Sequence, residues 1–150
     1  MVPQVPRYLA LAEALEAVQV PLEIVFAHND LLPANFIDDG ERLWLIDFEY
    51  AAFSTPMFDL AGIAGNALFA ADEDEALLAA YFAAPPSPDL IRSHAAMKCA
   101  SLLREAMWSM VSEIHLDAPG VDYIAYTAEN LERLEAALED YQSRFGEIAR

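Results

Sequence analysis

The sequence contains very little cysteine and very little lysine. Cys99 is its only cysteine, so neither an internal disulfide nor a cysteine-based metal cluster can form. Lys98 is its only lysine, and eight Lys plus Arg residues stand against 25 Asp plus Glu residues, for a formal net charge of −17. Because nucleic-acid binding requires positive charge against phosphates, this composition excludes a nucleic-acid partner. A single cysteine fits a reducing compartment, and we expect a cytoplasmic protein.

Long hydrophobic runs are also missing. The uncharged run over residues 60–71 contains Asn66 and is shorter than the roughly 20 apolar residues that cross a bilayer. The first residues lack the basic-then-apolar order of a signal peptide, so we expect no membrane partner. A hydrophobic content of 56% with 11% aromatics is ample for a core, which excludes a disordered acidic tail. We therefore expect one domain over residues 1–150.

Apolar spacing and turn signals predict a mainly helical α+β fold. A helix is expected over residues 8–18, a short strand over 22–27, and a hairpin of strands 35–37 and 43–48 around the Asp39-Gly40 turn. Helical signals follow from Phe58. Two further helix starts are expected, one at Asp72 with Glu75 as its capping partner and one at Ser87 ahead of Pro88, and a last helix over 124–145.

The last two helices each carry an apolar stripe that we expect to be buried. The stripes comprise Cys99, Leu102, Leu103, Ala106, Met107, Met110, Val111 and Ile114 in the first helix, and Ile124, Thr127, Leu131, Leu134, Leu138, Tyr141 and Phe145 in the second.

One constellation of polar residues surrounds the predicted hairpin. It begins with His28-Asn29-Asp30, continues to Asn35, and ends with Asp47 in Leu45-Ile46-Asp47-Phe48-Glu49. With residues 39–43 as the loop, Ile37 faces Leu45 and Asn35 faces Asp47, and directly opposed Cβ atoms lie about 4.5–5.5 Å apart. An amide oxygen and a carboxylate at that spacing suit Mg²⁺. Phosphoryl transfer needs such ligands together with a carboxylate that takes the acceptor's hydroxyl proton, which points to Asp30.

These segments resemble the C-terminal lobe of the choline/ethanolamine kinase family, within the aminoglycoside-phosphotransferase-like and protein-kinase-like superfamily. The resemblance runs from about residue 22 to residue 138 and includes residues 28–37, 44–51 and 58–61. It implies a helical lobe whose small hairpin carries Asp30 as catalytic base, Asn35 and Asp47 as metal ligands, and His28 and Asp59 as supports of the catalytic loop. Asp-Phe-Glu followed by Tyr50, in place of Asp-Phe-Gly, favours choline kinases over antibiotic kinases.

Three aromatic residues lie off the apolar stripes of the last two helices. Trp108 lies on the other face of its helix, and Tyr123 and Tyr126 each precede a stripe residue of theirs by one position. Choline kinases are similar in enclosing a quaternary ammonium with aromatics from these helices and an acid, and cation–π contact suits that ligand. The expected acceptor contacts are Trp108, Tyr126 and Glu49, followed by Tyr123 and Tyr50.

The acceptor itself stays open at this point. Glu105 stands where the family often has a further aromatic, so it either pairs with the cation or indicates a different acceptor. Choline, ethanolamine and thiamine are candidates, an aminoglycoside or other antibiotic phosphotransferase is the alternative enzyme, and a catalytically silent binding or scaffold lobe is the alternative of another class.

Glycine is scarce as well, and that scarcity bears on ATP. The five glycines form no Gly-x-Gly-x-x-Gly motif, and Lys98 falls within a predicted helix. A kinase of this kind needs a glycine-rich loop and a strand lysine for the phosphates of its co-substrate ATP. We therefore expect the N-terminal lobe to be missing from these residues, which makes the chain a fragment, a truncated reading frame or an inactive remnant, and we expect association through the apolar surface that such a lobe would cover.

Overall fold

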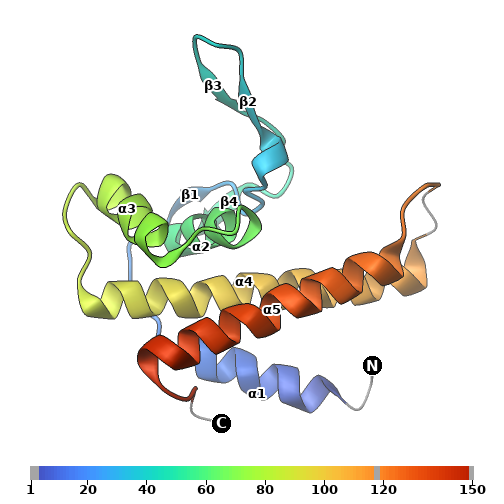
Figure 1. Cartoon of the computed structure of the whole chain (residues 1–150). Coiled ribbons are helices and arrows are strands. Elements are labelled where there is room, and N and C mark those ends of the chain that lie inside the picture. The colour runs from blue at the N-terminus through green and yellow to red at the C-terminus, as the bar shows by residue number, and fades with distance from the viewer. Residues whose placement is uncertain (1–3, 117–118, 149–150) are drawn as a thin grey trace.

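The computed structural model describes residues 4–116 and 119–148 and is mainly helical (Figure 1). The elements in chain order are α1 (Val5–Glu16), β1 (Val25–Ala27), the 3-10 turn η2 (Pro33–Asn35), β2 (Phe36–Asp38), β3 (Leu43–Leu45), β4 (Ala52–Ser54), α2 (Pro56–Asn66), α3 (Ala71–Phe82), α4 (Pro88–His115) and α5 (Tyr123–Phe145). The expected α+β, mainly α, class is confirmed. No helix in the described part of the chain is long and apolar enough to cross a membrane.

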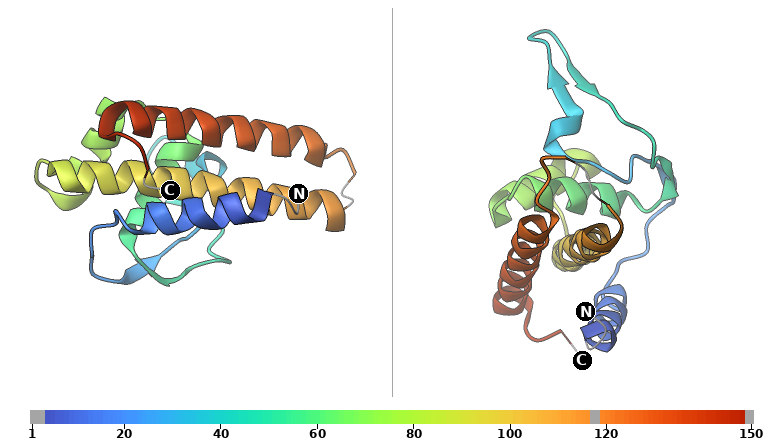
Figure 2. Two further views of the ribbon diagram at one scale, coloured as in Figure 1. Left: turned by 90° about the horizontal axis from the view of Figure 1, so that it is seen from below. Right: turned by 90° about the vertical axis from the view of Figure 1, so that its right-hand side faces the viewer.

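The long helix α4 is the centre of the fold. Helix α5 runs alongside it, α1 packs against it on another side, and α2 with α3 lies on the side that faces the strands (Figures 1 and 2). The main core is formed where α1, α4 and α5 meet, and a smaller cluster of Met57, Leu60 and Leu78 joins α2 to α3. The main core comprises Tyr8, Leu15, Ala95, Ala96, Cys99, Leu102, Leu103, Ala106, Met110, Leu134, Leu138 and Tyr141.

Only part of each predicted stripe is buried. The first half of the α4 stripe, from Cys99 to Ala106, lies in the core, as does Met110, whereas Met107, Val111 and Ile114 are exposed. The C-terminal end of α4, which includes Ile114, extends beyond α1 (Figure 2), and Met107 lines a cavity together with Ala12 and Leu15 of α1. Ile124, in the first turn of α5, is likewise exposed.

Polar caps begin most of the helices. The Ser87 side chain accepts a hydrogen bond from the Leu90 amide (3.2 Å), as expected, and Thr55 and Asp122 cap α2 and α5 in the same way. The predicted start of α3 is wrong. This helix begins one residue earlier, at Ala71, and Glu73 rather than Glu75 accepts the amide hydrogen bond of Ala70 (2.8 Å).

The hairpin forms, but the register predicted for it is wrong by one residue. Phe36 pairs with Leu45 and Ile37 with Trp44, and the Ile46 amide donates to the Asn35 carbonyl (3.0 Å). Asn35 is therefore opposite Ile46 and not Asp47. The turn is tighter than expected, because Asp39 Oδ1 accepts from the amides of Glu41 and Arg42 and closes the loop at residues 39–42.

Strand pairing near the loop also differs from expectation. The predicted strand over 22–27 is reduced to β1, and the strand over 43–48 to β3. Sequence patterning missed β4, whose residues Ala52–Ser54 pair antiparallel with β1. This short sheet joins the residues just before His28 to the residues just after Tyr50, and it brings both to the N-terminal end of α2.

Candidate functional site

The segment from His28 to Asn35, hereafter the 28–35 loop, connects β1 to β2 and is held at its start by one carboxylate. Asp59 Oδ2 accepts from the His28 amide and Asp59 Oδ1 from the Asn29 amide, both at 2.7 Å. Asp59 lies in the first turn of α2, which Thr55 caps and which packs against β1. The same helix thus fixes the strand and the loop that follows it, so Asp59 does more than an ordinary helix cap.

Two asparagine side chains hold the middle of the loop. Asn35 Nδ2 donates to the Asp30 carbonyl (3.0 Å) and Asn66 Nδ2 to the Leu31 carbonyl (3.4 Å). Asn29 adopts a left-handed backbone (φ 62°), which asparagine tolerates better than most residues. Its side chain accepts from Ser54 Oγ (2.6 Å) and donates to the Tyr50 carbonyl (3.1 Å). These contacts fix the backbone on both sides of Asp30.

His28 joins the loop to the segment that follows β3. Its Nε2 lies 2.8 Å from the Ile46 carbonyl oxygen and must carry the proton, since a carbonyl only accepts. The ring packs against Phe48 with centroids 4.6 Å apart. His28 is buried, and its Nδ1 has no hydrogen-bond partner among the described residues. The geometry of His28 is that of a fixed support and not of an exposed proton carrier.

The two predicted metal ligands, Asn35 and Asp47, lie on the two sides of the hairpin base. Asn35 is buried, and its Nδ2 is already bonded to Asp30, which leaves Oδ1 as the atom free to accept or coordinate. Asp47 is exposed and has a left-handed backbone (φ 66°). No cluster of three or more His, Cys, Asp or Glu side chains suited to a metal occurs in residues 4–116 and 119–148. Mg²⁺ often takes only one or two protein oxygens plus waters and substrate phosphates, so this pair fits it.

The carboxylate of Asp30 faces α4. Its Oδ1 accepts from Arg104 Nη2 (3.2 Å), and the side chain remains 20% exposed, so a small molecule can reach it. The Arg104 guanidinium also lies over the ring of Phe58, 5.4 Å from its centroid. A cavity of about 10 Å³, enough for one water, separates the loop from α2 and α4 at this point.

Three of the predicted acceptor residues come together on α4 and α5. The rings of Trp108 and Tyr126 meet edge to face with centroids 6.3 Å apart, and the Tyr126 hydroxyl donates to Glu105 Oε1 (2.7 Å). Burial, together with the neighbouring Glu105 carboxylate, raises the pKa of Tyr126 above its ordinary value. Glu105, Trp108 and Tyr126 are hereafter the aromatic cluster. Arg104 links it to the loop, because Arg104 Nη2 also lies 3.7 Å from Glu105 Oε2.

The other predicted acceptor residues lie elsewhere. Glu49 and Tyr50 are exposed on the turn before β4, and Tyr123 is the half-buried first residue of α5. No hydrogen bond or ring contact links them to the aromatic cluster within the described ranges. Tyr50 contributes its backbone carbonyl, which accepts from Asn29.

Sequence reasoning missed Arg104, Ser54 and Asn66. Arg104 was recognisable, since the helical positions three and four residues away on either side hold no acid that would explain it as an ordinary surface pair. Ser54 and Asn66 gave no such signal. Their partners, Asn29 and Leu31, lie 25 and 35 residues away, and only the fold brings them close.

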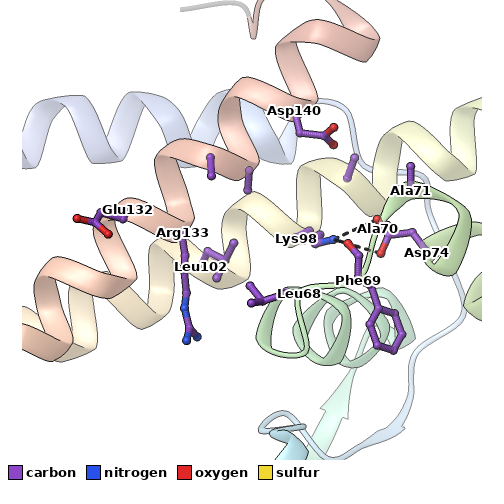
Figure 3. A pocket seen from close by; sticks show the side chains of 14 residues that line it. Leu68, Phe69, Ala70, Ala71, Asp74, Lys98, Leu102, Glu132, Arg133 and Asp140 are labelled. Atoms are coloured by element: carbon purple, nitrogen blue, oxygen red, sulfur yellow. Dashed lines mark hydrogen bonds and ion pairs between the residues drawn. The ribbon is translucent and has the colours of Figure 1, made fainter.

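The single lysine serves a structural purpose far from the loop. Lys98 Nζ donates to the Phe69 carbonyl (2.7 Å) and to both carboxylate oxygens of Asp74 (3.2 Å), at the edge of a cavity of about 390 Å³ between α3, α4 and α5 (Figure 3). Burial raises the pKa of Asp74, and the Lys98 charge opposes that shift. Lys98 is therefore committed to holding the start of α3.

A helical lobe whose hairpin base presents an aspartate, an asparagine and a second aspartate is the arrangement of kinase-type phosphotransferases. Comparison with known proteins agrees, since the sequence model of the phosphotransferase enzyme family matches residues 2–95, and the chain belongs to that family. Its relatives and structural neighbours in the family are choline and ethanolamine kinases.

Three comparisons define this relationship. A probable ethanolamine kinase of Arabidopsis thaliana is 30% identical over 122 residues, which cover 69% of this chain and 32% of that protein. The crystal structure of a choline/ethanolamine kinase family protein from Mesorhizobium loti is 31% identical, with a TM-score of 0.76 over 90% of this chain and 45% of the other. LicA in complex with AMP is 25% identical, with a TM-score of 0.61 over 87% of this chain and 45% of the other. The chain thus spans less than half the length of these relatives.

Proposed function

We propose that residues 1–150 form the acceptor- and metal-binding lobe of an ATP- and Mg²⁺-dependent kinase that phosphorylates the hydroxyl of a small amino alcohol, choline or ethanolamine. The observation that carries the proposal is the anchoring of the 28–35 loop. Asp59 holds its first two amides, Asn35 holds the Asp30 carbonyl, and the Asp30 carboxylate is left at an accessible position facing α4. Phosphoryl transfer depends mainly on such positioning.

In this proposal Asp30 is the catalytic base. Its carboxylate accepts the proton of the acceptor hydroxyl as the hydroxyl oxygen bonds to the γ-phosphorus, the bond from that phosphorus to the bridging oxygen breaks, and ADP leaves. His28 and Asp59 take no proton. They keep the loop in register with the hairpin, through the Ile46 carbonyl on one side and the loop amides on the other.

Asn35 and Asp47 are proposed as the protein ligands of Mg²⁺. When bound, the ion supplies positive charge that offsets the charge developing on the phosphoryl oxygens. The protein's own contribution is to present one amide oxygen and one carboxylate at the hairpin base, next to Asp30. The phosphates of ATP require a glycine-rich loop and a strand lysine. Residues 1–150 contain no Gly-x-Gly-x-x-Gly motif, and Lys98 lies in α4 and is bonded to Asp74, so we propose that both come from outside these 150 residues. The AMP bound to LicA supports an adenine nucleotide as the co-substrate.

The aromatic cluster supports a cationic acceptor. A cation over an aromatic face gains roughly 0.5–2 kcal/mol, and Glu105 adds an opposite charge beside it. The names of the relatives, ethanolamine kinase and choline/ethanolamine kinase, favour the same class of acceptor. Glu49, Tyr50 and Tyr123 remain proposed as outer contacts. Glu49 and Tyr50 are exposed and Tyr123 is half-buried, so all three can meet a ligand or a further part of the protein.

The test is a phosphorylation assay of two polypeptides, the 150-residue chain and the longest in-frame polypeptide that contains it. Choline, ethanolamine, thiamine and an aminoglycoside are each supplied with ATP and Mg²⁺. We expect the longer polypeptide to phosphorylate choline or ethanolamine and the 150-residue chain to be inactive alone. If only the aminoglycoside or only thiamine were phosphorylated, that compound and not choline or ethanolamine would be the acceptor. Absence of product from every acceptor would favour a silent binding lobe and contradict the proposal.

A further inference from the structure

Arg104 contacts both halves of the proposed site through a single nitrogen atom. Its Nη2 donates to Asp30 Oδ1 (3.2 Å) and lies 3.7 Å from Glu105 Oε2. Asp30 is 74 residues away in sequence, so the fold and not helix periodicity produces this pair. The arginines on α5 behave differently, since Arg133 and Arg144 each pair with an acid four residues before them.

The guanidinium is oriented by the same helix turn that holds the loop. Its carbon lies over the Phe58 ring at 5.4 Å, and Phe58 directly precedes Asp59, whose carboxylate holds the His28 and Asn29 amides. The first turn of α2 therefore fixes the loop backbone through Asp59 and the partner of the Asp30 side chain through Phe58. A flat group that stacks on an aromatic ring and donates from its edge is what arginine, and not lysine, provides.

We propose that Arg104 is a positioning residue for phosphoryl transfer, which holds the Asp30 carboxylate in its working orientation and at the same time serves as the internal counter-ion of Glu105. The proposal rests on the proposed role of Asp30 as catalytic base. Two opposite effects follow. Arg104 favours the chemical step, because a carboxylate that is free to rotate is less often aimed at the acceptor hydroxyl. It opposes acceptor binding, because a cationic acceptor must compete with Arg104 for Glu105.

Removal of Arg104 therefore has a signature that a purely structural or purely binding residue would not give. In the longest in-frame polypeptide, we expect Arg104→Ala to lower kcat roughly 10-fold or more, while KM for the cationic acceptor stays unchanged or falls. Arg104→Lys retains the positive charge but has a single nitrogen to donate, so its kcat should lie between those of Arg104→Ala and the wild type. Arg7→Ala is the matched control, because Arg7 Nη2 also donates to one carboxylate, Glu135 at 2.6 Å, between α1 and α5. It should leave both constants within twofold.

Two kinetic results would overturn the proposal. A kcat of Arg104→Ala within twofold of the wild type would mean that Asp30 needs no such partner. A raised KM with unchanged kcat would make Arg104 an acceptor-binding residue. Equal losses of kcat in Arg7→Ala and Arg104→Ala would trace the effect to general destabilisation and would contradict it as well.

A measurement independent of activity separates this proposal from the proposed function. In protein with isotope-labelled arginine, NMR reports rotation of each guanidinium group. We expect slow rotation for Arg104 that becomes fast in Asp30→Asn, whereas the Arg7 signal is unchanged by that substitution. If the wild type phosphorylates no acceptor but this signature is present, the proposed function fails and the positioning contact stands. If Arg104 rotates fast in the wild type, the positioning proposal fails, whether or not the protein is a kinase.

Discussion

The 28–35 loop and the aromatic cluster are held in place by different kinds of contact. The loop is fixed by side chains that bond to its backbone, from Asp59, Asn35 and Asn66, and these side chains lie in or next to regular elements. The aromatic cluster is fixed by one hydrogen bond and one ring contact between two helices, and Trp108 is 48% exposed. A rigid loop beside a more open cluster suits a site that performs one chemical step on an exchangeable acceptor.

The comparison predicts that loss of a loop contact has the largest effect. Asp59→Ala removes two charge-assisted hydrogen bonds and leaves the amides of His28 and Asn29 without their acceptor. We expect the free energy of unfolding to fall by about 3 kcal/mol and the exchange of both amides to accelerate, as measured by urea unfolding and hydrogen exchange.

Asp39→Ala is the matched control for this change. Asp39 also accepts from two backbone amides, those of Glu41 and Arg42, but it lies on the exposed hairpin turn where water can replace it. Asp39→Ala should lower the free energy of unfolding clearly less than Asp59→Ala does. Equal losses from the two substitutions would mean that the contact of Asp59 is no more than an ordinary turn contact.

A substitution in the aromatic cluster should change acceptor binding, measured as KM, and not the chemical step, measured as kcat. Trp108→Ala removes one aromatic face but leaves the loop intact, so we expect KM for a cationic acceptor to rise about 10-fold with kcat unchanged. Trp44→Ala is the control, because Trp44 is equally exposed, at 47%, but lies on the hairpin and bonds to Asp39. A fall in kcat without a change in KM would contradict the division between the two regions.

The smallest expected effect is spectroscopic. Burial and Glu105 both raise the pKa of the Tyr126 phenol, with burial the larger cause. In Glu105→Gln the carboxylate is gone but burial remains, so the pKa should move part of the way back toward its ordinary value. The pKa is measured by titrating the NMR signals of the Tyr126 ring above neutral pH. An unchanged or higher pKa would mean that the hydroxyl does not donate to Glu105.

The same comparison explains how much the sequence could reveal. The hairpin was predictable, because Asp39-Gly40 marks its turn, whereas the roles of Asp30, Asn35 and Asp47, which stand at characteristic spacing around it, stay predictions. The register was not, because it depends on Asp39 closing the turn one residue earlier than assumed. Strand β4 was also missed, since three residues carry too little periodicity to stand out.

The helices show the same limit. Their apolar stripes predicted the core at Cys99 and Leu134 correctly, yet Met107 and Val111 belong to the same stripe and are exposed. Periodicity identifies the apolar face of a helix, but the length of the neighbouring helix decides how much of that face is covered. The contacts of Arg104 and Asn66 depend on long-range packing in the same way, which no local pattern contains.

The most direct test of the account is the kcat of Asp30→Asn in the longest in-frame polypeptide, with ATP, Mg²⁺ and the preferred acceptor all saturating. The asparagine keeps the shape of the side chain and cannot accept the hydroxyl proton, so we expect kcat to fall by a factor of about 100 or more while thermal unfolding is unchanged. A kcat within threefold of the wild type would contradict the claim that the 28–35 loop exists to hold a catalytic base.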